Sequence, residues 1–298
     1  MGLTVKEILN ISEGILKDSG DSDYKQDAEI LLCHETKYTE NKLFMNWTRE
    51  LEDVHTEKIF ELIRRRADGT PTQYLTHEQV FMGHKFYVDE HVLIPRMDTE
   101  TLVVTVTEHL KGSPAKMVLD LCTGSGVLAV CLAKAYPSLK ITASDISEEA
   151  LTVARKNAVS AGVDKRISFI QSDLFAAFKT GFGGKKFDLI LSNPPYIKSD
   201  VLPTLQREIY EHEPMLALDG GMDGLDVYRK IIETVPAFLN KNGALFFEIG
   251  SEQASDVQAL LEAADAFSEI RIIQDLSGKD RVISARLTQV YPEKKHKK

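Results

Sequence analysis

The stretch Val118-Leu119-Asp120-Leu121-Cys122-Thr123-Gly124-Ser125-Gly126-Val127-Leu128-Ala129 joins an apolar strand-like run to a helix-like run through a glycine-rich turn. Glycines in such a turn let the backbone bend tightly and approach a ligand, with helix N–H groups aimed at it. From Met117 onward, short apolar runs alternate with helical ones, which is typical of a parallel, doubly wound sheet. The sequence therefore predicts an α/β fold with a ligand at this turn.

The hydrophobic pattern predicts the elements around the turn. Strands are expected at 117–121, 140–144, 167–171, 187–192 and 243–248, and helices at 98–110, 126–136, 147–161, 224–239 and 251–263. The last two apolar runs, 269–274 and 281–287, are separated by a turn without room for a helix. They are therefore predicted to form an antiparallel pair.

The first 75 residues predict a small helical bundle. Thr4 and Glu7 form a capping-box pair before an apolar stripe, and a charged helix over 53–66 ends in Arg64-Arg65-Arg66, which is predicted to be a solvated helix end. The run from Val80 to Val92 carries Phe, Tyr and Val, with Gly83 and an expected turn at Asp89-Glu90, which predicts a β-hairpin connector. The predicted organisation is a helical docking domain over 1–75, the connector over 76–94, a catalytic domain over 95–290 and a disordered basic tail over 291–298.

Composition restricts the partners. The 298 residues include 36 Lys and Arg and 45 Asp and Glu, for a net charge of −9, which argues against broad binding to nucleic acid. The three cysteines, Cys33, Cys122 and Cys131, form no paired ladder, which fits a reducing compartment. No signal peptide and no apolar run long enough to span a bilayer is visible. We therefore expect a cytoplasmic chain without a membrane partner.

Acidic residues follow the next two strands. Asp145, at the end of the second strand, can accept hydrogen bonds from both ribose hydroxyls of an adenosine-containing ligand. Asp173, followed by Leu174, is placed to meet an adenine edge. The pattern Gly124-x-Gly126-x-x-Ala129 also fits the dinucleotide fingerprint, so a nicotinamide or flavin enzyme competes. Asp120 favours S-adenosylmethionine, because a carboxylate there could meet the positively charged amino acid portion of that cofactor.

The segment Asn193-Pro194-Pro195-Tyr196 follows the fourth strand directly. The prolines fix the backbone and remove two N–H donors. The Asn193 side-chain oxygen and the Pro194 carbonyl can together accept both hydrogens of a planar NH₂ group, and the Tyr196 ring can pack against that group. Orienting the nitrogen of this NH₂ group toward the donor's methyl group, with hydrogen bonds to both of its N–H groups, would favour methyl transfer to that nitrogen. Such a transfer requires neither a metal nor a covalent enzyme intermediate.

The chain resembles the HemK/PrmC family of release-factor glutamine methyltransferases along nearly its whole length. The resemblance rests on the glycine-rich turn, on Asn193 to Tyr196, and on the segments 69–75, 92–100, 213–221 and 275–282. It implies a Rossmann-like class I S-adenosylmethionine-dependent methyltransferase sheet with a small N-terminal helical-bundle domain. Three departures stand out: Met97 replaces the usual Pro, His77 replaces a common Gly, and Cys122 replaces the first glycine of the fuller turn.

The resemblance also implies an activity, the methylation of the N5 amide nitrogen of glutamine in the Gly-Gly-Gln motif of class-1 peptide chain release factors. S-adenosylmethionine would be the donor and S-adenosylhomocysteine the product, and the N-terminal bundle would help to dock the protein substrate. The implied catalytic residues are Asn193, Pro194, Pro195 and Tyr196. The implied cofactor residues are Asp120, Cys122, Thr123, Gly124, Ser125, Gly126, Asp145, Asp173, Leu174 and Asn193.

Alternatives remain open at this point. Asn-Pro-Pro-Tyr is shared with amino methyltransferases that act on DNA and RNA, and a ribosomal-protein glutamine methyltransferase would use the same chemistry. A non-catalytic binding module or a nucleotide-dependent oxidoreductase is disfavoured by the intact Asn193–Tyr196 segment. His77, His84 and His91 recur every seven residues but lack matching Cys or carboxylate spacing, so no metal site is predicted.

Overall fold

The computed structural model describes residues 2–181 and 186–288, and these residues cluster into two compact units. One unit comprises the residues up to Glu78 together with Leu205–His212. The other comprises Gln79–Thr204 and the residues that follow His212. Each unit has apolar core clusters of its own. The predicted tail, 291–298, lies outside the described residues.

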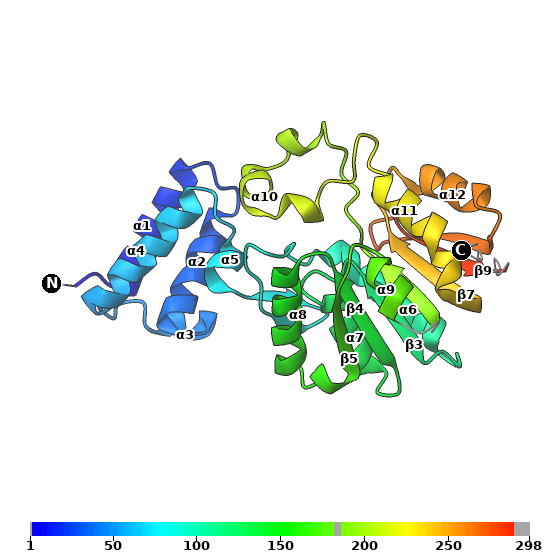
Figure 1. The fold of residues 1–298 in the computed structure, drawn as a ribbon. Helices are drawn as coiled ribbons and strands as arrows, with labels where there is room; N and C mark the ends of the chain where they lie inside the picture. The colour runs from blue at the N-terminus through cyan, green and yellow to red at the C-terminus, as the bar shows by residue number, and fades with distance from the viewer. Residues whose placement is uncertain (1, 182–185, 289–298) are drawn as a thin grey trace. The chain divides into compact units, whose positions relative to one another are not determined.

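The first unit is helical, as the sequence predicts, and its core includes the fully buried Ile8, Leu31 and Ile63. The predicted capping box is confirmed at the start of the first helix. The Glu7 N–H donates to the Thr4 hydroxyl over 3.3 Å, and the Glu7 carboxylate accepts from the Thr4 N–H over 2.8 Å. The helices of this unit are α1 (Val5–Asp18), α2 (Tyr24–Thr36), α3 (Glu40–Met45), α4 (Asp53–Ala67), α5 (Thr72–Thr76) and α10 (Arg207–His212) (Figure 1).

The prediction of a solvated helix end holds for Arg64 and Arg65, which are exposed, but is wrong for Arg66, near the end of α4. Its side chain is only 10% exposed, and it pairs with Asp21 over 3.2 Å, with Glu208 over 2.7 Å and with Asp27. A guanidinium so deeply buried needs carboxylate partners to offset its loss of hydration. Because Glu208 belongs to α10, this cluster holds a distant segment of the chain within the helical unit.

The predicted hairpin is present but shorter than expected. Strands β1 (Gln79–Phe81) and β2 (His84–Phe86) pair antiparallel. Between them, Met82 and Gly83 have φ values of 50° and 71°, as a two-residue type I′ turn requires. The hairpin turn therefore lies at Met82 and Gly83, whereas the expected turn at Asp89-Glu90 is present as a separate turn, closed by a hydrogen bond from the Val92 N–H to the Asp89 carbonyl over 3.2 Å.

A seven-stranded sheet forms the centre of the second unit, in the order β5-β4-β3-β6-β7-β9-β8. The strands from β5 to β7 are parallel, whereas β9 runs antiparallel to both β7 and β8. This arrangement confirms the predicted fold class, including the antiparallel final pair. The strands are β3 (Met117–Leu121), β4 (Lys140–Asp145), β5 (Ile167–Gln171), β6 (Phe187–Ser192), β7 (Leu239–Glu248), β8 (Phe267–Gln274) and β9 (Asp280–Leu287).

Helices cover both faces of this sheet. Alternate side chains of β3 point to opposite faces, and both faces carry apolar side chains that the helices bury. Val118 packs with Leu102 and Val130 on one face, and Leu119 packs in the cluster of Tyr228 on the other. The α-helices are α6 (Glu100–Leu110), α7 (Val127–Ala135), α8 (Glu148–Ser160), α9 (Ala176–Gly181), α11 (Asp226–Thr234) and α12 (Ala254–Ala263) (Figure 1). Short 3₁₀ turns are η1 (Met97–Thr99), η2 (Asp164–Arg166), η3 (Leu202–Thr204), η4 (Met215–Ala217) and η5 (Val235–Ala237).

β3 lies where the strand order reverses, with β4 on one side and β6 on the other. In doubly wound sheets the crevice at such a switch point is where ligands bind. The glycine-rich turn after β3 and the Asn193–Tyr196 segment after β6 both begin at this edge. The fold therefore brings together two motifs that are far apart in the sequence.

The boundaries around β7 differ from the prediction. The helix expected to continue to residue 239 ends at Thr234, and η5 follows. Pro236 has no N–H to continue the α-helical hydrogen bonds, which accounts for the early end. β7 begins at Leu239 rather than at 243, with a register shift against β6.

Candidate active site

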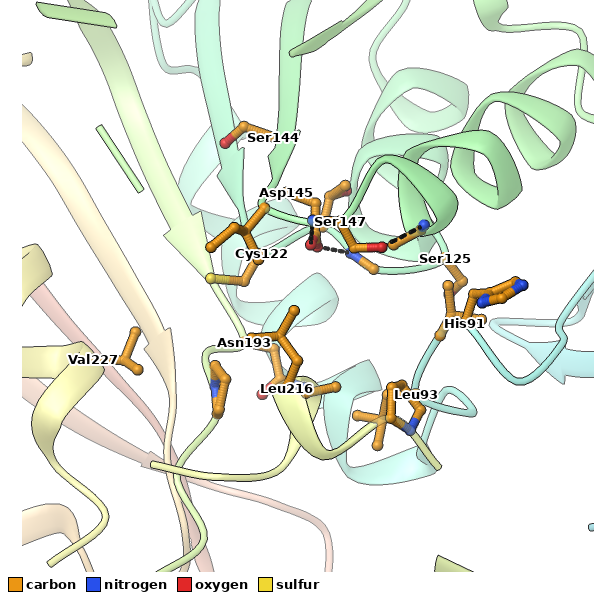
Figure 2. Close-up of a pocket in the computed structure, with 18 of the residues that line it drawn as sticks. His91, Leu93, Cys122, Ser125, Ser144, Asp145, Ser147, Asn193, Leu216 and Val227 are labelled. Carbon is orange, nitrogen blue, oxygen red and sulfur yellow. Dashed lines mark hydrogen bonds between the residues drawn. The ribbon is translucent and has the colours of Figure 1, made fainter. Parts of the chain in front are cut away.

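A cavity of about 460 Å³ opens at the carboxyl edge of the parallel strands. Small-molecule sites commonly enclose about 300–1,000 Å³. Its walls combine the ends of β3 to β6 with residues 90–99 and parts of 214–230, and Figure 2 shows Cys122, Asp145 and Asn193 around it. Nine of the predicted site residues line the cavity: Cys122, Thr123, Gly124, Ser125, Asp145, Asp173, Leu174, Asn193 and Pro195.

The turn after β3 is held in left-handed backbone conformations. Cys122, Gly124 and Gly126 have φ values of 58°, 54° and 80°. A side chain at such a φ costs about 1–2 kcal/mol, so Cys122 carries strain that the glycine it replaces would not. A Cβ on Gly124 would meet no atom within 4 Å, whereas one on Gly126 would lie 2.9 Å from the Ala154 Cβ. Gly126 therefore allows α7 and α8 to approach each other and does not line the cavity.

Asp120 lies inside β3 and is fully buried. One carboxylate oxygen accepts from the Thr123 hydroxyl over 2.6 Å and from the Ala129 N–H over 3.2 Å, which ties the turn to the start of α7. The other oxygen has no hydrogen-bond partner within the described part of the chain. Burial raises the pKa of Asp120 to about 7. Asp120 does not line the cavity, so its predicted contact with a cofactor stays a prediction.

Asp145, at the end of β4, faces the cavity (Figure 2). One of its oxygens accepts from the Gly124 N–H over 2.8 Å, and the other accepts from the Ser147 N–H over 3.1 Å. Burial raises the pKa of this carboxyl, and the backbone donors partly offset that rise. Because the Gly124 N–H already donates to Asp145, it is not available to donate to an anionic ligand. Asp145 keeps lone pairs for hydroxyl donors.

Asn193 begins the loop after β6, and its side-chain nitrogen donates to the Thr99 hydroxyl oxygen over 3.2 Å. That bond leaves the side-chain oxygen as the acceptor for a ligand. Pro194 is buried and does not line the cavity with its neighbours Asn193 and Pro195. No backbone donor among residues 2–181 and 186–288 is bonded to the Pro194 carbonyl.

Tyr196 is half-buried and does not line the cavity. Its phenol donates to the Glu248 carboxylate over 3.4 Å, and burial raises the pKa of the phenol. Its backbone carbonyl accepts from the Gln253 side chain over 3.0 Å. The structure thus shows Tyr196 holding the loop to β7 and α12, and the predicted packing of its ring on a planar group stays a prediction.

A glycine loop supports the Asn193–Tyr196 segment from outside. A Cβ on Gly220 would lie 2.7 Å from the Tyr196 Cα, and one on Gly224 would lie 2.4 Å from the Tyr196 carbonyl oxygen. The loop also pairs with Ile197, whose N–H donates to the Leu218 carbonyl over 3.0 Å. Only glycine allows so close an approach of two backbones.

The charge of the cavity favours a cation. Its described lining includes the carboxylates of Glu90, Asp145, Asp173 and Asp219, but only one lysine, Lys230. Such a wall repels a pyrophosphate and attracts the positive sulfonium and ammonium groups of S-adenosylmethionine. The lining thus fits this cofactor better than it fits a nicotinamide or flavin dinucleotide.

Several lining residues are not among the residues that the sequence predicts for the site. They include Thr99, which bonds Asn193, and Leu216 and Ala217 of η4. The signal was present, because the segments 92–100 and 213–221 were both among those that carry the family resemblance. Glu213 shows how these segments meet: it is buried, accepts from the Ile94 N–H over 3.3 Å and pairs with Arg96.

Within the described ranges, no group of three or more His, Cys, Asp or Glu side chains is placed to hold a metal ion. In the same part of the chain, none of the helices combines the length and the apolar character that a membrane span requires.

Two families match separate parts of the chain. The PrmC N-terminal domain matches residues 7–76, and the methyltransferase small domain matches residues 93–223. These two matches coincide with the helical segment of the first unit and with the part of the second unit that carries both motifs.

Curated relatives match nearly the whole chain. A release factor glutamine methyltransferase of Bacillus cereus is 36% identical over 96% of this chain and 100% of its own length. Relatives with the same name from Clostridium acetobutylicum and Moorella thermoacetica are 36% and 38% identical, each over 95% of this chain and 98% of their own length. With this identity over both lengths, together with the sheet order and the cavity, the chain is a methyltransferase and belongs to the family of release factor glutamine methyltransferases.

Proposed function

We propose that this protein methylates the side-chain amide nitrogen, N5, of the glutamine in the Gly-Gly-Gln motif of class-1 peptide chain release factors, with S-adenosylmethionine as the donor. The observation that carries the proposal is the orientation of Asn193, whose nitrogen is bonded to Thr99 while its oxygen stays available beside the cavity. Family membership supports the choice of glutamine and of release factors. A cytoplasmic location and docking of the substrate by the helical unit belong to the same proposal.

The donor would be held by the residues that line the cavity at the ends of β3 to β5. Asp145 would accept from the ribose hydroxyls, Asp173 would meet the adenine edge beside Leu174, and residues 122–126 would follow its amino acid end. The bound donor supplies a methyl group activated by a positively charged sulfur. The described carboxylates of the lining stabilise positive charge.

The acceptor amide needs help because its nitrogen lone pair is delocalised into its carbonyl group. The Asn193 oxygen and the Pro194 carbonyl would each accept one N–H, which orients the nitrogen and stabilises the positive charge that develops on it. Pro195 has no N–H to compete for these acceptors. Tyr196, bonded to Glu248, keeps the loop in place for this contact.

Two other substrates use the same chemistry. A ribosomal protein glutamine would offer the same amide, and DNA or RNA would offer a planar exocyclic amino group. The net charge of −9 and the acidic cavity lining oppose a nucleic-acid backbone at this site. Only a direct assay separates the two protein substrates.

The test uses the full chain with labelled S-adenosylmethionine and purified class-1 release factors. We expect label on the wild-type release factor and none on a variant in which the glutamine of Gly-Gly-Gln is replaced by alanine. Peptide mass spectrometry should then place a single methyl group on that glutamine. Labelling of ribosomal protein or of nucleic acid in place of release factor would reject the proposal.

A further inference from the structure

We propose that Asn157, on α8, is a positioning residue for S-adenosylmethionine, an inference that rests on the proposed function. The donor would lie between two walls of the cavity. One wall is the turn over 122–126, and the other is the segment 90–93, here called the connector wall. Figure 2 shows Ser125 on the first wall and His91 on the second. Asn157 is bonded on both sides and so fixes the space between them.

The Asn157 side chain is 2% exposed and uses both ends of its amide group. Its oxygen accepts from the Tyr87 N–H over 2.7 Å. Its nitrogen donates to the Tyr87 carbonyl and to the Ser125 carbonyl, each over 2.9 Å. These three partners allow only one orientation of the amide, because the two carbonyl oxygens require donors and the N–H requires an acceptor. Tyr87 lies three residues before the connector wall and Ser125 lines the cavity, so one buried side chain ties the two walls together.

A second contact holds α8 against the turn. Ala154 lies three residues before Asn157 and therefore on the same face of the helix. A Cβ on Gly126 would lie 2.9 Å from the Ala154 Cβ, so the helix and the turn are in close contact there. Asp120 and Asp145 hold the same turn from β3 and β4. Asn157 adds the attachment that reaches the connector.

Hydrogen exchange tests this link in the wild-type full chain. Tyr87 does not line the cavity, so its amide would report the cofactor through Asn157. We expect S-adenosylmethionine at about 100 times its Kd to slow exchange of the Tyr87 N–H by about fivefold or more. The Met82 N–H, in the same connector but bonded to the Glu100 carboxylate over 2.7 Å, is the control and should change by less than about twofold. A donor that binds without slowing Tyr87, or that slows both amides equally, would overturn the positioning role.

The variants Asn157→Asp and Asn157→Ala separate hydrogen bonding from the filling of space. Both remove the donors for the Tyr87 and Ser125 carbonyls. Aspartate has nearly the shape of asparagine but sets an oxygen against these two carbonyl oxygens. We expect the Kd for S-adenosylmethionine, measured by calorimetry, to rise by about tenfold or more in both variants, the effect of one lost buried hydrogen bond. A Kd close to that of wild type in Asn157→Asp would show that the side chain only fills space, and would overturn the proposal.

The kinetic effect should be confined to the donor. At saturating S-adenosylmethionine, the kcat of Asn157→Ala with release factor should stay within about threefold of wild type, because the hydrogen bonds of Asn157 go to the turn and the connector. Val163→Ala, at a buried core position after α8 that does not line the cavity, is the matched control and should lower Tm while its Kd stays within about twofold. A loss of kcat with an unchanged Kd would overturn the positioning role. A wild-type chain that binds the donor but labels no release factor would instead overturn the proposed function.

Discussion

In the proposed function the Asn193 side-chain oxygen would accept from the acceptor amide, while its side-chain nitrogen donates to the Thr99 hydroxyl. Asn193→Ala removes that oxygen but leaves the turn over 122–126 and Asp145 unchanged. We expect turnover to fall by about 100-fold or more, as when one donor is removed from a preorganised site. The Kd for S-adenosylmethionine, measured by calorimetry, should change by less than about threefold. If both quantities fell equally, Asn193 would have to be assigned to cofactor binding alone.

Asp120 should make the free energy of unfolding depend on pH. Its pKa is about 7 in the folded protein, against 3.8 for an ordinary aspartate, so the folded state keeps a proton that the unfolded state has released. Stability from this group is therefore greatest at acidic pH and is lost as the pH rises toward about 7, by about 1.4 kcal/mol per unit of pKa difference.

Urea unfolding followed by circular dichroism between pH 5 and pH 8 measures this dependence. Asp120→Asn carries no titrating carboxyl, so its decline in stability with pH should be less steep than that of wild type. Asp164→Asn, at an exposed position, is the control and should keep the wild-type slope. A stability of Asp120→Asn that fell as steeply as that of wild type would show that Asp120 does not hold the proton.

Some residues of the candidate site could be placed from the sequence, and others could not. Asp145 and Asp173 could be placed at the cavity because each follows a parallel strand, and such strand ends share one edge. Asp120 could not, because periodicity gives the strand but not the internal donors, Thr123 and Ala129, that bind its carboxylate. Thr99 had no assigned role because its partner lies 94 residues away in the sequence.

At the scale of elements, the loop before α11 packs closely against the backbone of the loop after β6 and so restricts its position. Gly224 has a φ of 75°, and a Cβ there would lie 2.4 Å from the Tyr196 carbonyl oxygen. Gly224→Ala must therefore displace one of the two loops in addition to straining its own backbone. We expect it to lower kcat by more than tenfold, because a shift of about 1 Å misplaces the acceptor.

Gly162→Ala is a control that introduces backbone strain without displacing a neighbouring loop. Gly162 follows α8 with a similar φ of 69°, but a Cβ there would meet no atom within 4 Å. This control should lose about 1 kcal/mol of stability and keep its kcat. Equal kcat values in the two variants would show that the close approach at Gly224 does not position the active-site loop.

Element types were predictable where the hydrophobic pattern is long. The strands β3 to β6 and the helices α6, α7, α8 and α12 agree with the sequence to within a few residues. The helices α5, α9 and α10 were missed, since five or six residues are too few to display a helical period. The early start of β7 depends on pairing with β6, which no local pattern encodes.

At the scale of the whole molecule, the assignment of Leu205–His212 to the helical unit was beyond prediction. The chain passes from the loop after β6 into this segment and then returns to the second unit at Glu213. What holds the segment is the ion pair between Arg66 and Glu208, residues more than a hundred positions apart. Sequence patterns report local structure, whereas this division of the chain depends on a long-range contact.

Cofactor binding should raise the thermal stability of the second unit more than that of the first. The intrinsic fluorescence of Trp47 can measure this difference. Trp47 is the chain's only tryptophan, and it packs at the edge of the helical core, stacked on Phe44 at 5.3 Å between ring centroids. Its fluorescence therefore reports unfolding of the first unit, whereas circular dichroism reports both units. The predicted cofactor residues all lie in the second unit.

S-adenosylmethionine at about 100 times its Kd should add about 2.7 kcal/mol to the stability of the second unit. For a unit of this size the corresponding rise in Tm is about 5–10 °C. We expect circular dichroism to show this shift while the transition of Trp47 fluorescence moves by less than about 1 °C. Asp145→Ala, which removes the proposed ribose acceptor, should reduce the shift seen by circular dichroism. Equal shifts of both signals would mean that the two units unfold as one cooperative body, because binding to one unit stabilises only what unfolds with it.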